Sequence, residues 1–198
     1  MKLYITAPSP FARKCRIVAR EKGLTERIEE IAVDPYANAP ELLASNPIVQ
    51  VPTLIAEDGL PISDSPVICE YLDRLGSGPL LLPPDGPERL QVRRMETKAN
   101  AVLEMGVKLL LELRRPENER SPSWIARWTE NMGRALDALE ATHPNPDDLD
   151  MGVITAGVAV AWIGFRHPGF DWRSGRPHLV ALHPAIESRP SFADTRPG

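Results

Sequence analysis

Hydrophobic and polar positions follow two different periodicities in the two parts of the chain. In the first part, short apolar runs alternate with segments whose apolar residues recur at helical spacing. This pattern predicts strands at residues 2–6, 27–33, 53–57 and 60–63, and helices at residues 10–22, 38–45 and 67–75. The Asp58-Gly59 pair between the last two strands is a favourable hairpin turn. The predicted order of elements is therefore βαβαββα.

The second part shows helical periodicity only. Residues 88–115 contain no proline and carry apolar side chains at helical intervals. Further helices are predicted at residues 122–142, 147–166 and 178–187, with an interruption of the last one at Pro184. Residues 153–165 are apolar enough to form the central buried helix of this part. We expect a first domain at residues 1–77, a Gly- and Pro-rich linker at residues 78–87 and an all-helical domain at residues 88–198.

Composition indicates a globular protein and excludes some classes of partner. The 198 residues are 42% hydrophobic and 25% charged, with a net charge of −4. The acidic balance argues against nucleic acid or an anionic membrane as a partner. No apolar run approaches the roughly 20 residues of a membrane span, and no signal-peptide pattern precedes the first strand. The two cysteines lack metal-site or CxxC spacing, so we expect no metal and a cytoplasmic location.

The Val51-Pro52 pair stands directly before a predicted strand. Proline removes a donor from the hydrogen-bond ladder of a sheet, so its presence there calls for a reason. An ordinary trans proline at a strand start is one interpretation. A cis Val51–Pro52 bond is the other, and it would turn the backbone N–H and C=O of Val51 outward to pair with a peptide-like ligand.

Three segments carry a family resemblance: residues 9–14 (SPFARK), residues 46–54 (NPIVQVPTL) and residues 64–72 (DSPVICEYL). Together with the order of elements, they resemble the glutathione S-transferase family, and most of all bacterial members with serine at the active-site position. The resemblance implies an α/β plus all-α fold, with a thioredoxin-like N-terminal domain followed by a helical domain. It also implies a homodimer and favours the cis form of Val51–Pro52.

Ser9 is the candidate catalytic residue, since it lies between the first strand and the start of the first helix. A serine hydroxyl that donates to the sulfur of glutathione, beside the N–H groups of a helix terminus, favours the thiolate, which is the nucleophile. The alternative is that Ser9 is only an N-cap. The two roles are compatible because a cap uses the oxygen as acceptor and activation uses the hydrogen as donor.

Five further residues are candidates for binding glutathione. Asp64 is placed to take the ammonium of its γ-glutamyl end, and the Ser65 hydroxyl with the following helix N–H groups to take the carboxylate. Val51, held open by Pro52, would pair its backbone with the cysteinyl unit, and Gln50 would reach the glycine end. The alternatives are an N-cap at Ser65 and an ordinary exposed side chain at Gln50.

Other residues near these segments have plainer interpretations. Arg13 and Lys14 are predicted to lie on a solvated helix face, and Cys15 and Cys69 to be buried thiols of the core. Thr155 is placed where the family often has a capping box, a Ser or Thr followed three residues later by an acidic residue. Here Val158 stands at the acidic position, so Thr155 can still cap a helix but the reciprocal acidic side chain is absent.

The predicted function is transfer of glutathione to a small electrophile of unknown identity, with glutathione as co-substrate and no tightly bound cofactor. Two alternatives stay open. One is a non-catalytic member of the family that acts as a binding or regulatory module. The other is a glutathione-dependent reductase or peroxidase, although no cysteine stands at the Ser9 position to form a mixed disulfide.

Overall fold

A computed structural model describes residues 1–197 and divides the chain into two compact units. Unit 1 comprises residues 1–81 together with the segment that begins at Pro190, and unit 2 comprises residues 82–189. The predicted domains at residues 1–77 and 88–198 stay a prediction. The hydrophobic pattern did not predict that the last residues of the chain belong to the first unit.

Unit 1 is built on a four-stranded mixed sheet with the strand order β2-β1-β3-β4. The strands are β1 (Lys2–Ile5), β2 (Glu29–Ala32), β3 (Thr53–Ile55) and β4 (Pro61–Ser63). β1 pairs with β2 in parallel and with β3 in antiparallel, and β4 is antiparallel to β3. Consequently β4 runs in the same direction as β1.

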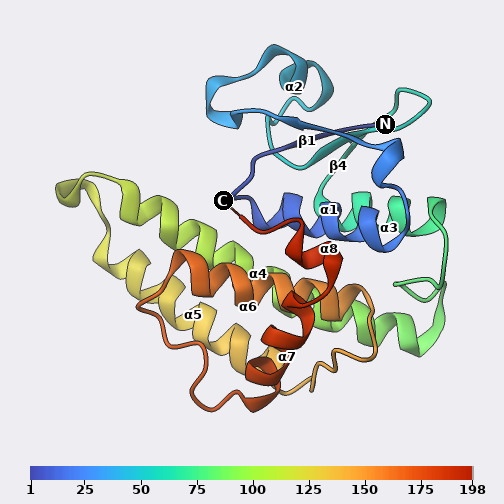
Figure 1. Ribbon diagram of the computed structural model, residues 1–198. Helices are drawn as coiled ribbons and strands as arrows, with labels where there is room; N and C mark the ends of the chain where they lie inside the picture. Colours follow the sequence, from blue (N-terminus) through green and yellow to red (C-terminus); the bar gives the residue numbers. More distant parts are fainter. Residues whose placement is uncertain (198) are drawn as a thin grey trace. The chain divides into compact units, whose positions relative to one another are not determined.

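The helices of unit 1 are α1 (Pro10–Glu21), α2 (Pro40–Ser45), α3 (Ser65–Leu75) and the short α8 (Pro190–Ala193), with 3₁₀ turns at Thr25–Arg27 and Pro35–Ala37. In Figure 1, α1 and α3 lie side by side along one side of the sheet. The order βαβαββα is the order predicted from the hydrophobic pattern.

The prediction of a solvated face at Arg13 and Lys14 was wrong. Arg13 is 2% exposed and Lys14 is fully buried. The C-terminal segment covers this face of α1: a guanidinium nitrogen of Arg13 donates to the Phe192 carbonyl at 3.0 Å. The Arg13 guanidinium also lies 5.5 Å from the centre of the Phe192 ring. A segment about 180 residues away along the chain therefore contributes to the burial of Arg13.

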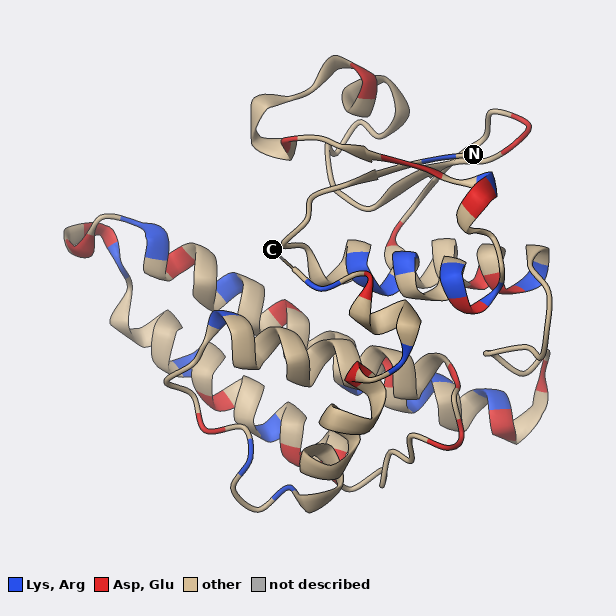
Figure 2. Ribbon diagram, in the orientation of Figure 1, with Lys and Arg blue, Asp and Glu red and all other residues tan. Residues whose placement is uncertain are grey.

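Unit 2 is helical, with α4 (Gly86–Arg114), a 3₁₀ turn (Glu117–Glu119), α5 (Pro122–Glu140), α6 (Met151–Arg166) and α7 (Pro177–Glu187). The first ten residues of α6 are all buried, which confirms the prediction that this segment is the central helix. α4 and α7 both pack against it. Figure 2 shows few charged positions on α6, whereas α4 and α5 carry many.

Two details of unit 2 differ from the predictions. Helix α6 is capped by the Asp150 carboxylate, which accepts the Val153 N–H at 2.7 Å, whereas Thr155 lies inside the helix and donates to the Met151 carbonyl. Helix α7 continues through Pro184 without interruption. Its apolar side chains, including the fully buried Leu182, pack in the core, and this packing outweighs the missing backbone donor.

No helix between residues 1 and 197 is long and apolar enough to cross a membrane. The same residues contain no group of three or more His, Cys, Asp or Glu side chains that is suited to hold a metal ion.

Candidate functional site

The strand register brings three loops of unit 1 to one edge of the sheet. Thr53, the first residue of β3, pairs with Tyr4 near the end of β1 and with Ser63 at the end of β4. The loop that follows β1, the segment that precedes β3 and the loop that follows β4 therefore leave the sheet at the same edge. These three segments hold all the site residues predicted from the sequence.

Ser9 is the N-cap of α1, and its side chain is half-buried. Its Oγ accepts the backbone N–H of Ala12 at 3.2 Å. The capping interaction uses the oxygen as acceptor and leaves the hydroxyl hydrogen for a second partner. Since α1 presents its N-terminal end here, an anion held by this hydroxyl would also lie in the favourable field of the helix dipole.

Val51 and Pro52 are joined by a cis peptide bond. Pro52 is buried and Val51 is half-buried. Among residues 1–197 the backbone N–H and C=O of Val51 have no hydrogen-bond partner, although β3 begins only two residues later. Gln50 is exposed, and its side chain forms no hydrogen bond with residues 1–197.

Two residues that sequence reasoning gave no role hold this loop in place. Asn46, which is 3% exposed, donates through Nδ2 to the Gln50 carbonyl at 3.2 Å and to the Thr53 Oγ1 at 2.9 Å. Thr53 Oγ1 in turn donates to the same carbonyl at 2.8 Å. Both residues belong to the segment 46–54. Their polar side chains, close to Val51-Pro52 in the sequence, were the one signal from which this supporting role could have been predicted.

Ser65 is the first residue of α3 and is 1% exposed. Its Oγ is buried and has no hydrogen-bond partner within the described chain, and the same is true of its backbone N–H. An unpaired buried hydroxyl costs free energy, so native structures rarely retain one without a reason. The hydroxyl and the N–H of one residue at a helix N-terminus together form a pair of donors suited to a carboxylate.

Asp64 precedes α3 with a backbone φ of 68°, in a region that residues other than glycine rarely adopt. Its side chain is exposed and makes no capping hydrogen bond to α3. Asp64 therefore stands at the N-cap position without capping through its side chain, and Ser65, the N-cap in one interpretation of the sequence, is instead the first residue of the helix. Strained backbone of this kind occurs often at ligand-binding positions.

Cys15 of α1 and Cys69 of α3 are both fully buried, as predicted for core thiols. The Cys69 Sγ is 3.7 Å from the Cys15 Sγ, which in turn lies 3.9 Å from the Ser65 carbonyl oxygen. Burial, and to a lesser extent Cys69, raises the pKa of the Cys15 thiol well above its ordinary value. The Cys15 thiol is therefore protonated at neutral pH, and burial makes both thiols inaccessible.

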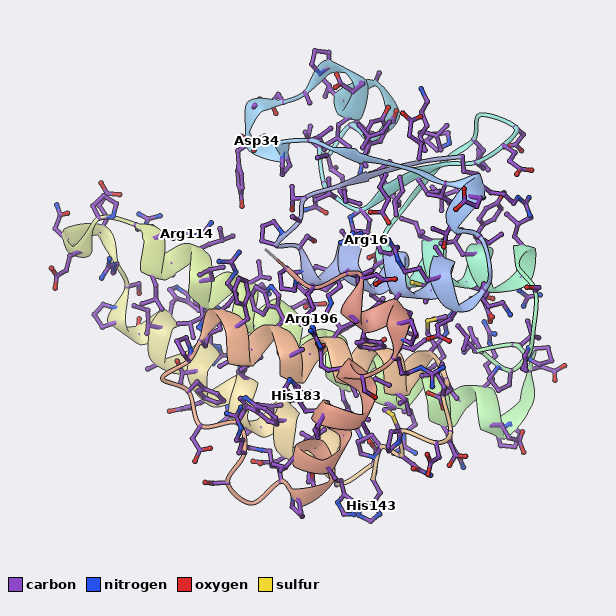
Figure 3. The ribbon with its side chains drawn as sticks, viewed as in Figure 1. Arg16, Asp34, Arg114, His143, His183 and Arg196 are labelled. Carbon is purple, nitrogen blue, oxygen red and sulfur yellow. The ribbon has the colours of Figure 1, made fainter. Side chains whose placement is uncertain are left out.

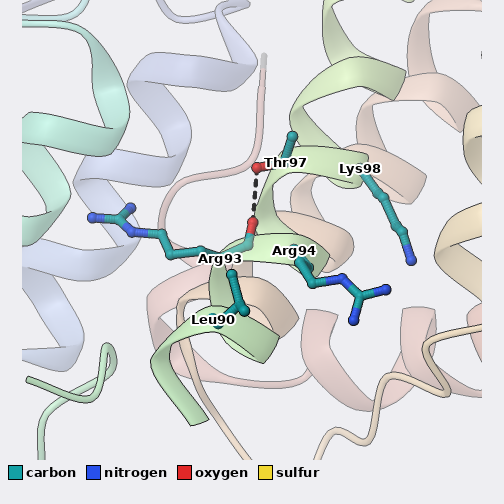
Figure 4. Close-up of a pocket in the computed structure, with 5 residues that line it drawn as sticks. All are labelled: Leu90, Arg93, Arg94, Thr97 and Lys98. Carbon is teal, nitrogen blue, oxygen red and sulfur yellow. Dashed lines mark hydrogen bonds between the residues drawn. The ribbon is translucent and has the colours of Figure 1, made fainter. Parts of the chain in front are cut away.

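The hollow drawn in Figure 4 belongs to unit 2 and to none of the predicted site residues. It has a volume of about 310 Å³ and is lined by one face of the first half of α4: Leu90, Arg93, Arg94, Thr97 and Lys98. Its only internal hydrogen bond in the figure runs from the Thr97 hydroxyl to the Arg93 carbonyl, at 2.8 Å. An open, single-helix hollow of this kind lacks the convergent polar groups of a binding pocket.

Comparison with known proteins places the chain in a family. The uncharacterized GST-like protein YibF of Escherichia coli K12 is 36% identical over 202 residues, which cover 100% of this chain and 98% of that protein. The chain belongs to the glutathione S-transferase family. The model of the glutathione S-transferase N-terminal domain matches residues 8–75, a range that includes every predicted site residue.

Solved structures of the glutathione S-transferase family share the fold over the whole length. A family member from Pseudomonas fluorescens Pf-5 with bound glutathione has a TM-score of 0.94 and 30% identity, covering 100% of this chain and 98% of that chain. A second structure from the same organism, with bound S-(propanoic acid)-glutathione, has a TM-score of 0.88 and 29% identity, with 100% of both chains covered. The fold predicted from the sequence, a thioredoxin-like domain followed by a helical domain, is confirmed.

Proposed function

We propose that this protein is a glutathione transferase that binds glutathione in unit 1 and activates its thiol for attack on a small electrophile. The observation that carries the proposal is the buried, unpaired Oγ of Ser65 at the N-terminus of α3. The family membership and the glutathione bound by the Pseudomonas fluorescens protein support it.

Each part of glutathione has a matching group at this edge of the sheet. The Ser65 hydroxyl and N–H take the γ-glutamyl carboxylate, and the exposed Asp64 carboxylate takes the ammonium beside it. The unpaired backbone of Val51, next to Pro52, takes the cysteinyl unit as an added strand. Gln50 reaches the glycine end.

Ser9 supplies the chemistry in this proposal. Its hydroxyl hydrogen, which the capping interaction leaves unused, donates to the glutathione sulfur and stabilises the thiolate. The thiolate attacks the electrophilic carbon, a C–S bond forms, and the leaving group departs or the electron pair is taken up by the acceptor.

Conjugation is favoured over disulfide exchange through the protein. A protein–glutathione mixed disulfide needs an accessible thiolate. Cys15 and Cys69 are fully buried, and Ser9 occupies the helix start where a reactive cysteine would stand. The buried, unpaired Ser65 hydroxyl likewise favours a working glutathione site over an idle family fold.

Calorimetric titration with glutathione tests the binding proposal. We expect Ser65→Ala and Asp64→Asn each to weaken binding by about tenfold or more, since each removes a charge-assisted hydrogen bond. Asp147→Asn, which neutralises an exposed aspartate of unit 2, is the matched control and should bind like the unaltered protein. Failure of the folded, unaltered protein to bind glutathione would overturn the proposal.

We further propose that the protein is a homodimer, as the family resemblance implies. The exposed Leu90 on α4, at 61% exposure, is an apolar side chain that such an interface would cover. Sedimentation equilibrium should give twice the chain mass for the unaltered protein and a lower mass for Leu90→Glu. A monomer at micromolar concentration would contradict this proposal.

A further inference from the structure

Helices α4 and α6 pack in parallel with a close, well-defined register. A Cβ added at Gly106 would lie 2.8 Å from side-chain atoms of both Trp162 and Ile163, and one added at Gly152 would lie 2.9 Å from the Met95 Cβ. Position 152 therefore lies beside 95, and position 163 beside 106. Since 11 residues separate the contacts on each helix, the two helices run in the same direction and end at the same end of unit 2.

Each of these helices ends in an arginine. Arg114 is the last residue of α4 and Arg166 the last residue of α6. Figure 3 shows the Arg114 side chain near the end of its helix. Because α4 and α6 run in the same direction, the two guanidinium groups belong to the same end of unit 2. Burial lowers the pKa of the Arg166 guanidinium, and the positive charge of Arg114 lowers it further, as expected for two cations at one end of the unit. Like charges repel, so an anion bound beside them would be stabilising.

The Arg166 guanidinium contacts an aromatic ring but leaves one of its N–H groups without a hydrogen bond. Its central carbon lies 4.3 Å from the centre of the Phe165 ring, a cation–π contact. Its Nε is buried and has no hydrogen-bond partner within residues 1–197. An unpaired N–H of a guanidinium is costly to bury, and Nε with a terminal nitrogen forms the fork that binds a carboxylate.

The carboxylates closest to Arg114 along the chain pair with other groups. Neither Arg114 nor Arg166 forms an ion pair within the described part of the chain. Glu112 instead accepts the backbone N–H at the N-cap of α5 at 2.7 Å, and Glu119 pairs with Arg115 at 3.4 Å. The end of unit 2 at which α4 and α6 terminate therefore holds two uncompensated cations.

We propose that Arg114 and Arg166 form an anion-binding site, and that the electrophile of this transferase carries a carboxylate or a similar anionic group held by these two side chains. This inference rests on the proposed function for its second half, because it names the class of substrate that a transferase site would accept. Its first half, the anion-binding site, depends on the two arginines alone and is tested with an aromatic carboxylate.

Turnover of two matched electrophiles tests the substrate class. Chlorodinitrobenzene is neutral, and chlorodinitrobenzoate is the same aryl chloride with a carboxylate; in both, glutathione sulfur displaces chloride. We expect Arg114→Gln and Arg166→Gln to lower kcat/KM for the benzoate by about tenfold or more and to change kcat/KM for the neutral chloride by less than about threefold. Arg94→Gln removes an exposed arginine from the other end of α4 and should affect neither.

Binding of the unreactive dinitrobenzoate, measured by calorimetry, separates the two proposals. Loss of dinitrobenzoate binding in Arg114→Gln but not in Arg94→Gln supports the anion site even if neither aryl chloride is turned over, a result that would count against the proposed function alone. Equal effects on both chlorides, or unaltered dinitrobenzoate binding in Arg114→Gln, would overturn the inference. Arg114 is exposed, so its variant keeps the test decisive if Arg166→Gln does not fold.

Discussion

The ammonium of Lys22 lies 3.1 Å from the carboxylate of Asp73, and each side chain is only 1% exposed. The pair joins the end of α1 to α3 inside unit 1. Lys22 also donates to the Pro79 carbonyl at 2.7 Å, and the Asp73 carboxylate accepts the Leu81 N–H at 2.9 Å. A buried pair with these additional hydrogen bonds satisfies charges that would otherwise be costly to bury, and it ties residues 78–81 to the two helices.

Removal of one partner of this pair should be strongly destabilising. We expect Lys22→Met to lower the free energy of unfolding by about 3–5 kcal/mol, because it removes the buried ammonium that lies 3.1 Å from the buried Asp73 carboxylate. Urea denaturation measures the change. Arg27→Met is the control: Arg27 pairs with Glu57 at the surface, and its loss should cost less than about 1 kcal/mol. Equal costs for the two variants would show that the Lys22 pair is not buried as described.

Two glycines should respond to alanine in opposite directions. A Cβ at Gly76 would lie 2.4 Å from the Lys22 Cβ and 2.6 Å from the Lys22 carbonyl oxygen, so Gly76→Ala must displace backbone at the end of α1. We expect a loss of about 1–3 kcal/mol. At Gly133, inside α5, the nearest atom would be 3.9 Å away, and Gly133→Ala should add about 0.5–1 kcal/mol. Thermal and urea unfolding of both variants would measure this, and a stabilising Gly76→Ala would contradict the close approach.

The buried thiol of Cys15 should make stability depend on pH in alkaline solution. Burial and Cys69 raise the pKa of Cys15 in the folded chain, so the folded state keeps a proton that the unfolded chain releases above about pH 8.5. The unfolded state then binds fewer protons, and the free energy of unfolding falls with rising pH, by up to about 1.4 kcal/mol per unit. Below the ordinary thiol pKa this contribution to stability is fully present.

Comparison of Cys15→Ala with the unaltered protein isolates this effect. The variant should show a shallower decline in the free energy of unfolding between about pH 8 and pH 10, whatever its stability at neutral pH. Urea denaturation at a series of pH values is the measurement. Parallel pH profiles for the two proteins would mean that Cys15 does not keep its proton in the folded state.

Ser9 and Ser121 provide a matched pair for separating capping from catalysis. Each is an N-cap serine followed by proline, and each accepts a backbone N–H through Oγ, from Ala12 and Trp124 respectively. Ser9→Ala and Ser121→Ala should both lower stability by about 1 kcal/mol. Only Ser9→Ala should also lower kcat for conjugation, by about tenfold or more, and raise the pKa of bound glutathione.

The pKa of bound glutathione is read from the ultraviolet absorbance of its thiolate as a function of pH. Unchanged turnover and thiolate absorbance in a folded Ser9→Ala protein would limit Ser9 to capping. A similar loss of turnover in Ser121→Ala would show that the effect comes from reduced stability.

Local features of the sequence determined the elements and the identity of the candidate site. The serine-proline pairs at Ser9, Ser65 and Ser121 predicted where three helices begin, since N-cap preference and the fixed φ of proline act within a few residues. The alternation of strands and helices predicted the βαβαββα order for the same reason. The segments 46–54 and 64–72 identified the candidate glutathione site because the family resemblance rests on contiguous residues.

Only the tertiary structure decided the features that depend on distant segments. Arg13 is buried where its guanidinium contacts the segment around Phe192, and a local sequence pattern cannot predict a neighbour so far away along the chain. Helix α7 persists through Pro184 because its packing outweighs a local preference. The placement of Arg114 and Arg166 at the same end of unit 2 follows from the parallel packing of α4 and α6 at Gly106 and Gly152, contacts between residues far apart along the chain.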